Sequence, residues 1–149
     1  MRFPFKVIRD GQGFTARRPV FQFVVQGSTP SRPCYCLLDT GTPDVLVMAD
    51  LAEEAGIDLA DAEPIDEFIL EGEACTGRRI NATCVVLDGH HELELLDIPV
   101  IFVTPWPGKR QFCGVLGTLG MEHMRGTVSV REQWFDLSAE SSSAQPAPR

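Results

Sequence analysis

The sequence has no long apolar run and few basic residues. No stretch of its 149 residues approaches the roughly 18 apolar residues that a membrane-spanning helix needs, and Met1–Gly13 contains no apolar block typical of a secretory signal peptide. Lysine and arginine number 13 against 21 aspartate and glutamate residues, a net charge of −8. Because nucleic acids and anionic membranes are bound through basic surfaces, we expect neither as a partner. We predict a cytoplasmic protein.

The sequence also lacks a Cys-x-x-Cys pair, and its cysteine count, five, is odd. Without a secretion signal, this pattern favours reduced thiols over disulfides. Cys34 and Cys36 alternate along an expected strand and share one face, where small core residues are the simpler interpretation than a metal or redox pair. The adjacent His90 and His91 fall in an expected turn, where an exposed loop is the simpler interpretation than a metal pair. We therefore predict no metal site and no cofactor.

Helical patterns are scarce, and the chain is instead rich in short apolar or alternating runs. One short helix is expected in the segment 49–57, capped by Asp50 and ended by Gly56. Strands are expected at 3–8, 19–27, 34–39, 44–48, 67–73, 79–87, 127–131 and 134–137, and one or two strands at 91–104. This pattern predicts an all-β barrel or sandwich. We assign 1–137 to one domain and predict that 138–149, which is small, polar and proline-containing, is a disordered tail.

Two of these strands flank the segment Ala74-Cys75-Thr76-Gly77. They predict a β-hairpin over 67–87 with Gly77 in or near its tip. The neighbouring Arg78 and Arg79, like Arg17 and Arg18 earlier in the chain, are most simply solvated turn charges, although Arg78 and Arg79 would reach a substrate if Gly77 forms the tip.

Asp39 raises the main chemical question, because an apolar run leads directly into its carboxylate. Burying a lone carboxylate costs several kcal/mol unless another group pairs with it or keeps it protonated. An ordinary Asx turn at the end of a strand is one explanation. A phosphoryl-transfer motif is another, but it needs a different spacing and the alternating helices of an α/β core.

The order of elements around Asp39-Thr40-Gly41 resembles the retropepsin-type aspartic proteases. In that family an apolar strand enters the catalytic turn, and a strand, a short helix in cellular and bacterial members, a hairpin flap and an apolar-apolar-Gly element follow. Val115-Leu116-Gly117 fits the last element, as does the overlapping stretch that begins at Leu119-Gly120. Thr42 departs from the alanine or serine usual in retropepsins, and the arginine of several viral members is absent, with Thr118 or Met121 in its place.

The resemblance implies a retropepsin-like closed barrel and an aspartic endopeptidase. Two carboxylates about 3 Å apart share one proton, so that one activates water while the other donates to the substrate carbonyl. Asp39 would be one half of this pair, the Thr40 hydroxyl would bond across to the partner turn, and Gly41 would let the backbone approach. The expected substrate contacts are Thr42 and the hairpin segment Ala74, Cys75, Thr76 and Gly77.

No second Asp-Thr-Gly or Asp-Ser-Gly occurs in the sequence. An active site would therefore need two chains related by a two-fold axis, and the expected partners are a second copy and a peptide or protein substrate. The alternative is a catalytically silent retropepsin-like module that dimerises or binds peptides. Trp106, in a proline-rich loop, would line a substrate pocket or pack at an edge.

Overall fold

The computed structural model describes residues 1–9, 12–107 and 112–138, and 57% of these described residues are in strands and 8% in helices. The tail predicted to be disordered lies, from residue 139 onward, outside the described residues. The elements in chain order are β1 (Arg2–Pro4), β2 (Lys6–Arg9), β3 (Thr15–Arg18), β4 (Val20–Gln26), β5 (Cys34–Leu38), β6 (Val45–Met48), α1 (Asp50–Glu54), β7 (Glu63–Leu70), β8 (Glu73–Asp88), β9 (His91–Thr104), β10 (Gly114–Leu116), α2 (Thr118–His123), β11 (Thr127–Ser129) and β12 (Trp134–Asp136).

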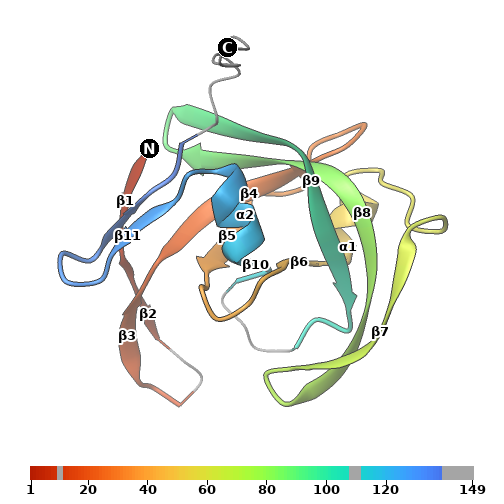
Figure 1. Cartoon of the computed structure of the whole chain (residues 1–149), viewed down its shortest axis with the longest axis horizontal. Helices are drawn as coiled ribbons and strands as arrows, with labels where there is room; N and C mark the ends of the chain where they lie inside the picture. The colour runs from red at the N-terminus through yellow and green to blue at the C-terminus, as the bar shows by residue number, and fades with distance from the viewer. Residues whose placement is uncertain (10–11, 108–111, 139–149) are drawn as a thin grey trace, which may run out of the picture.

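The largest sheet closes on itself. Its strands run in the order β4-β5-β10-β6-β9-β8-β7, and β4 also pairs with β8. This extra pairing completes a closed barrel of six strands, with β7 attached outside it (Figure 1). The expectation of an all-β closed barrel is confirmed. Closure leaves no unpaired edge within the ring, which suits a chain of short strands.

The main apolar core fills the barrel and extends to Phe3 and Leu137. Phe3 stacks on Phe135 with ring centroids 4.9 Å apart, and Phe21 lies 5.9 Å from Phe135. These rings bring the small sheet β1-β12-β11 against the barrel wall. The amino group of Met1 donates a hydrogen bond of 2.6 Å to the carbonyl of Leu137, so the two ends of the domain are held together.

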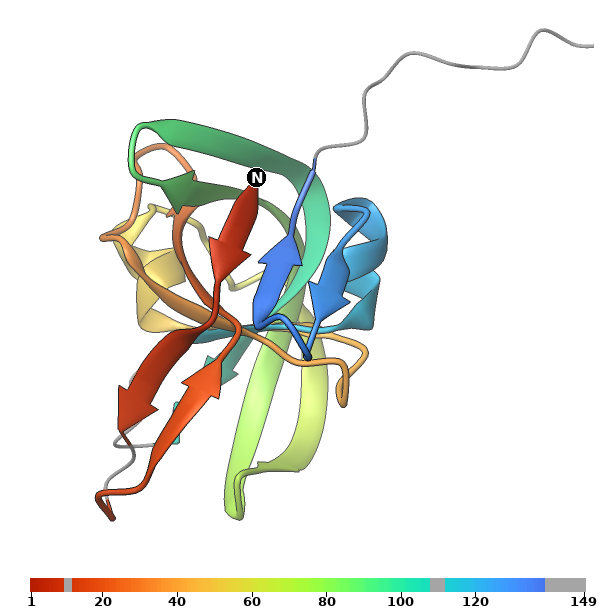
Figure 2. The ribbon, with the colours of Figure 1, turned by 90° about the vertical axis from the view of Figure 1, so that its left-hand side faces the viewer.

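Two hairpins project from the same side of the barrel (Figures 1 and 2). One is β2–β3, and the other is β7–β8, which is the hairpin expected from the sequence. Its tip, however, is not at Ala74–Gly77. Leu70 pairs with Glu73, so Glu71 and Gly72 form a two-residue turn in which both have positive φ, +50° and +81°. Such turns suit the right-handed twist of paired strands.

Gly77 lies inside β8 because three strands meet there. It pairs with Ile65 on one side and with Val103 on the other. A Cβ atom at this position would lie 2.6 Å from Cγ2 of Ile101. The glycine therefore serves close strand packing rather than a turn.

Two other local expectations from the sequence were wrong. Asp50 is the first helical residue rather than the cap, and Ala49 takes the cap position without a side-chain hydrogen bond. Arg17 and Arg18 lie on the exposed strand β3, which pairs with β2, rather than in a turn. Strand β5 alternates in burial, and Tyr35 is 37% exposed. In the described part of the chain, no helix is both long and apolar enough to cross a membrane.

Candidate active site

Asp39 follows β5 directly and begins the turn that leads to β6. Its backbone N–H donates a hydrogen bond of 3.0 Å to the carbonyl of Leu116, which anchors the start of the turn to β10. Its side-chain Oδ1 accepts a hydrogen bond of 2.8 Å from the N–H of Gly41. Asp39 is half-buried, whereas Thr40 and Gly41 are exposed. The Gly41 N–H thus fixes the carboxylate within the turn, and the exposed Thr40 and Gly41 leave the turn accessible to solvent.

Strand β10 lies between β5 and β6 and crosses behind this turn. It pairs in parallel with β5, with Leu116 opposite Leu38, and antiparallel with β6, with Leu116 opposite Val45. At the end of β10, the N–H of Gly117 bonds to the carbonyl of Asp44 at 3.0 Å, and that of Thr118 to the carbonyl of Thr42 at 2.9 Å. These bonds tie the turn after β5 to the start of α2.

Gly117 is the glycine that permits this contact. A Cβ atom there would lie 2.4 Å from the backbone oxygens of both Asp44 and Thr42. Gly120, by contrast, faces the side chains of Leu116 and Val45 inside the packing of α2. The structure therefore selects Val115-Leu116-Gly117 as the apolar-apolar-Gly element that packs against the Asp39 turn.

An apolar hollow of about 110 Å³ opens on one side of Asp39. The tip of the β7–β8 hairpin forms its far wall through Leu70 and Glu71. The other lining residues, which come from β5, β6, β10 and the adjoining segments, are Leu37, Thr42, Leu46, Phe112 and Val115. A carboxylate at the edge of an apolar hollow is an arrangement that can hold an apolar side chain while presenting an acid or base to it.

The structure places the expected site residues in two groups. Asp39, Thr40, Gly41 and Thr42 form the single turn described above, and Thr42 lines the hollow. Ala74–Gly77 lie in β8 behind the hairpin tip and are not among the residues that line the hollow. Cys75 is 1% exposed, with its thiol 3.2 Å from the carbonyl of Pro105, and the Thr76 hydroxyl donates to the carbonyl of Thr104 at 3.2 Å.

Sequence reasoning missed the residues that the hairpin does bring to Asp39. The useful signal was the pair Glu71-Gly72 between two alternating runs, since X-Gly is a common two-residue hairpin turn. The walls supplied by Phe112 and Val115 come from a segment more than 70 residues after Asp39, and sequence spacing does not reveal such a contact.

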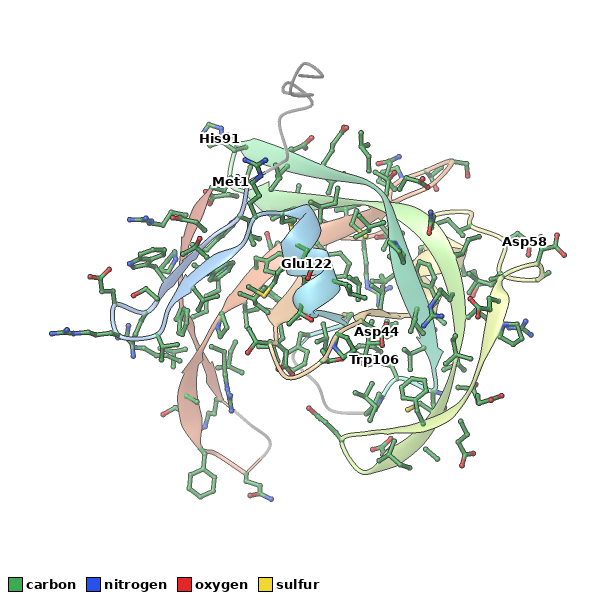
Figure 3. The ribbon with its side chains drawn as sticks, in the orientation of Figure 1. Met1, Asp44, Asp58, His91, Trp106 and Glu122 are labelled. Carbon is green, nitrogen blue, oxygen red and sulfur yellow. The ribbon has the colours of Figure 1, made fainter. Side chains whose placement is uncertain are left out.

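The base of the hairpin is also connected to the Asp39 turn. Arg79 on β8 lies with Nη2 3.8 Å from Oδ1 of Asp44 and Nη1 3.5 Å from Oε2 of Glu63. Arg78 donates a hydrogen bond of 3.2 Å to the carbonyl of Ala62. Both arginines are therefore strand residues with partners rather than solvated turn charges. Figure 3 places Asp44 at the lower centre of the molecule, on the side from which the hairpins project.

Trp106 packs against apolar residues of the barrel and is not among the residues that line the hollow. Its Nε1 donates a hydrogen bond of 3.1 Å to the carbonyl of Phe112, and its ring belongs to a second apolar cluster centred on Leu46, Ile101 and Val115. His90 and His91 are exposed at the turn between β8 and β9, as expected, and Figure 3 places His91 at the molecular edge. Among the described residues, no group of three or more His, Cys, Asp or Glu side chains could hold a metal ion.

Comparison with known proteins agrees with this geometry at the level of the fold. No family model and no curated protein matches the sequence. Among solved structures, the chain is similar to a retropepsin-like aspartic protease from Rickettsia conorii, with a TM-score of 0.53 and 15% sequence identity. The similarity covers 91% of this chain and 89% of the other. The fold is retropepsin-like. At this identity the likeness concerns the fold alone.

Proposed function

We propose that the chain is an aspartic endopeptidase that acts as a homodimer. The observation that carries the proposal is the position of Asp39 on a turn backed by β10 and facing the tip of the β7–β8 hairpin across an apolar hollow. An ordinary Asx turn explains the hydrogen bond from Gly41 to Asp39 but requires neither the crossing strand nor the hollow. The retropepsin-like fold of the structural neighbour supports the same assignment.

In the proposed mechanism, the Asp39 carboxylates of two chains lie side by side and share one proton. Two like charges at about 3 Å cannot both ionise, and aspartic proteases are the general example of this behaviour. The ionised carboxylate takes a proton from the attacking water, and the protonated one donates to the carbonyl oxygen of the peptide. The N–H of Gly41 holds one carboxylate oxygen, and the exposed Thr40 is available to the partner turn.

The hollow supports a substrate with an apolar side chain next to the scissile bond. Its walls are mostly aliphatic or aromatic, so that burying such a side chain contributes about 1.5–3 kcal/mol of binding free energy. The hairpin tip would cover the bound peptide and exclude water from the reacting groups. In the alternative function, a peptide-binding or dimerisation module, the same hollow would bind a peptide without cleaving it.

The decisive experiment replaces Asp39 with asparagine and measures cleavage of a library of unstructured peptides. Asparagine keeps an oxygen for the Gly41 N–H but removes both the acid and the base. We expect cleavage to fall by about a hundredfold or more, because proton transfer contributes on that scale.

Asp58→Asn is the matched control. Asp58 is exposed, lies at the right-hand edge of Figure 3, and accepts a hydrogen bond of 2.8 Å from the N–H of Ala60, which is the same local turn as at Asp39. This variant should cleave at the wild-type rate. An Asp39→Asn variant that retains more than about a tenth of wild-type cleavage would overturn the proposal. A wild-type protein that binds peptides but never cleaves them would favour the alternative module.

A further inference from the structure

Two thiols that the proposed mechanism does not use, Cys34 and Cys113, lie near each other, and Cys113 is next in sequence to Phe112, which lines the hollow. Cys113 precedes β10 and Cys34 begins β5, and these strands are parallel neighbours in the barrel. The described part of the chain holds its cysteines as free thiols. Cys113 packs against the apolar cluster that contains Cys34, and the two thiols lie close enough for each to shift the pKa of the other.

The backbone fixes Cys113 on both sides. Its N–H donates a hydrogen bond of 2.8 Å to the carbonyl of Tyr35, the residue after Cys34, and its carbonyl accepts one of 2.9 Å from Met48 on β6. Neighbouring strands are about 4.8 Å apart, and disulfides span Cα separations of roughly 4.4–6.8 Å. Gly114 pairs with Cys36, so Cys113 lies opposite Tyr35 and Cys34 is one residue farther along β5. A rise of about 3.3 Å per residue then gives a Cα separation of about 6 Å between Cys34 and Cys113, which is inside the disulfide range.

The two cysteines differ in exposure and in their charged surroundings. Cys34 is 8% exposed, whereas Cys113 is half-buried and in reach of solvent. The hydrogen bond from Cys34 lowers the pKa of Cys113 to about 7, opposed by partial burial and assisted by the Arg32 guanidinium. The hydrogen bond with Cys113, together with burial, raises the pKa of Cys34 far above its usual range.

The charges around Cys113 come from two elements. Arg32, in the loop before β5, lowers the pKa of the Cys113 thiol through its positive charge. Glu54 of α1 forms an ion pair with the Arg32 guanidinium and accepts a hydrogen bond of 3.0 Å from the backbone N–H of Arg32. Asp50 of α1 acts in the opposite direction and raises the pKa of Cys113. Arg32 is thus held beside the sulfur, a setting typical of reactive cysteines.

We propose that Cys113 and Cys34 form a peroxide-sensitive dithiol, in which Cys113 is the attacking thiol and Cys34 the resolving thiol. Cys113 attacks one oxygen of hydrogen peroxide, the O–O bond breaks, and the products are Cys113 sulfenic acid and water. The Cys34 thiol then displaces the sulfenic hydroxyl, which leaves as a second water, and the S–S bond forms. Two thiols are oxidised by two electrons, and one peroxide is reduced.

Oxidation of the two cysteines would add a covalent link to one wall of the hollow. Phe112, which lines the hollow together with Asp39, is bonded directly to Cys113. A disulfide would link this wall to the base of β5 by a covalent bond in addition to the backbone hydrogen bonds.

The test treats the full chain with hydrogen peroxide and maps its cysteines by mass spectrometry of unreduced peptides. We expect an intramolecular Cys34–Cys113 disulfide that dithiothreitol reverses. In Cys34→Ser we expect Cys113 sulfenic acid, trapped with dimedone, and no disulfide. In the control Cys84→Ser, which removes a thiol that is 4% exposed in the core, the Cys34–Cys113 disulfide should form as in the wild type.

A second measurement uses iodoacetamide without any oxidant. At pH 7.5 Cys113 should be alkylated about tenfold or more faster than Cys84, since the thiolate is the nucleophile. Folding is checked by circular dichroism in every sample. A folded wild-type protein that gives no Cys34–Cys113 disulfide, or that links Cys113 to another cysteine or another chain, would overturn the proposal. The readout is thiol chemistry, so the result does not depend on peptide cleavage.

Discussion

At the scale of single residues, the turn that carries Asp39 depends on close backbone contact. The apolar run before Asp39 predicted a strand that ends at this carboxylate, and β5 does end at Leu38. The sequence did not decide which glycine packs against the turn, because Gly117 and Gly120 both follow apolar residues. The choice depends on the crossing of β10 between β5 and β6, which brings Thr42 and Asp44 from distant sequence onto Gly117.

Gly117→Ala should destabilise the protein and displace the Asp39 turn. Its added methyl group would meet two backbone oxygens at 2.4 Å, and backbone atoms cannot move aside as a flexible side chain can. We expect a loss of about 1–3 kcal/mol in the free energy of unfolding, as for other overpacked sites, with a larger proportional loss of peptide cleavage. Urea unfolding and a cleavage assay at matched folded fraction would measure the two effects.

Gly126→Ala serves as the control for this prediction. Its added methyl would approach the side chain of Met121 at 3.2 Å, and that side chain is flexible and can adjust. The control should lose less than half of the stability that Gly117→Ala loses. Equal losses in the two variants would contradict the close-approach explanation.

At the scale of elements, the order of strands was largely predictable and the details of the hairpin were not. Alternating or continuous apolar runs located β4, β6 and β9, because these strands contribute buried side chains to the core. The tip was misplaced because Gly77 resembles a turn residue in sequence, whereas its actual role is to fit between β7 and β9. Strand β3 was missed because all four of its residues are exposed, which removes the apolar pattern.

The tip of the β7–β8 hairpin should open readily on the timescale of hydrogen exchange. Ile69 is 68% exposed, and the turn residues Glu71 and Gly72 are exposed. Local opening costs little free energy where few apolar contacts hold a segment. We expect the amides of residues 69–73 to exchange at least about a hundredfold faster than those of Leu37 and Leu38. Equal protection in the two segments would argue against a flap.

The terminal sheet should lose support in acid. Arg2 forms two hydrogen bonds with Asp136, at 2.9 and 2.7 Å, and this pairing lowers the pKa of Asp136. A carboxylate with a depressed pKa stabilises the fold above its unfolded pKa of about 3.9 and loses that contribution as the pH falls through the lower folded value. Asp136→Asn should therefore flatten the fall in melting temperature below about pH 4.

Asp61→Asn is the control for the acid prediction, because Asp61 is an exposed carboxylate in the loop before β7. Its melting temperature should depend on pH as in the wild type. The same acid dependence in Asp136→Asn as in the wild type would show that other carboxylates cause the loss.

At the scale of the whole molecule, the sequence predicted a closed β barrel but not the surface that a second copy would cover. A single Asp-Thr-Gly turn per chain requires two chains for a carboxylate pair. On the Thr40 side of the turn, the structure has an open hollow of about 300 Å³ that Asp39 and Thr40 share with Arg17, Arg18 and Val130. Val130 is 75% exposed, as an apolar residue at an interface between copies would be in one isolated chain.

The last prediction joins assembly to pH. Val130→Asp should weaken the dimer, so that sedimentation shows monomers at concentrations where the wild type is dimeric, and peptide cleavage should fall in parallel. Leu96→Asp, a change at an exposed β9 residue outside this hollow, should leave both unchanged. In the proposed mechanism, only a dimer with one shared proton is competent, so wild-type activity should follow a bell-shaped curve with its optimum at roughly pH 3–6. A fully active monomer, or activity that rises steadily beyond about pH 8, would contradict the two-carboxylate mechanism.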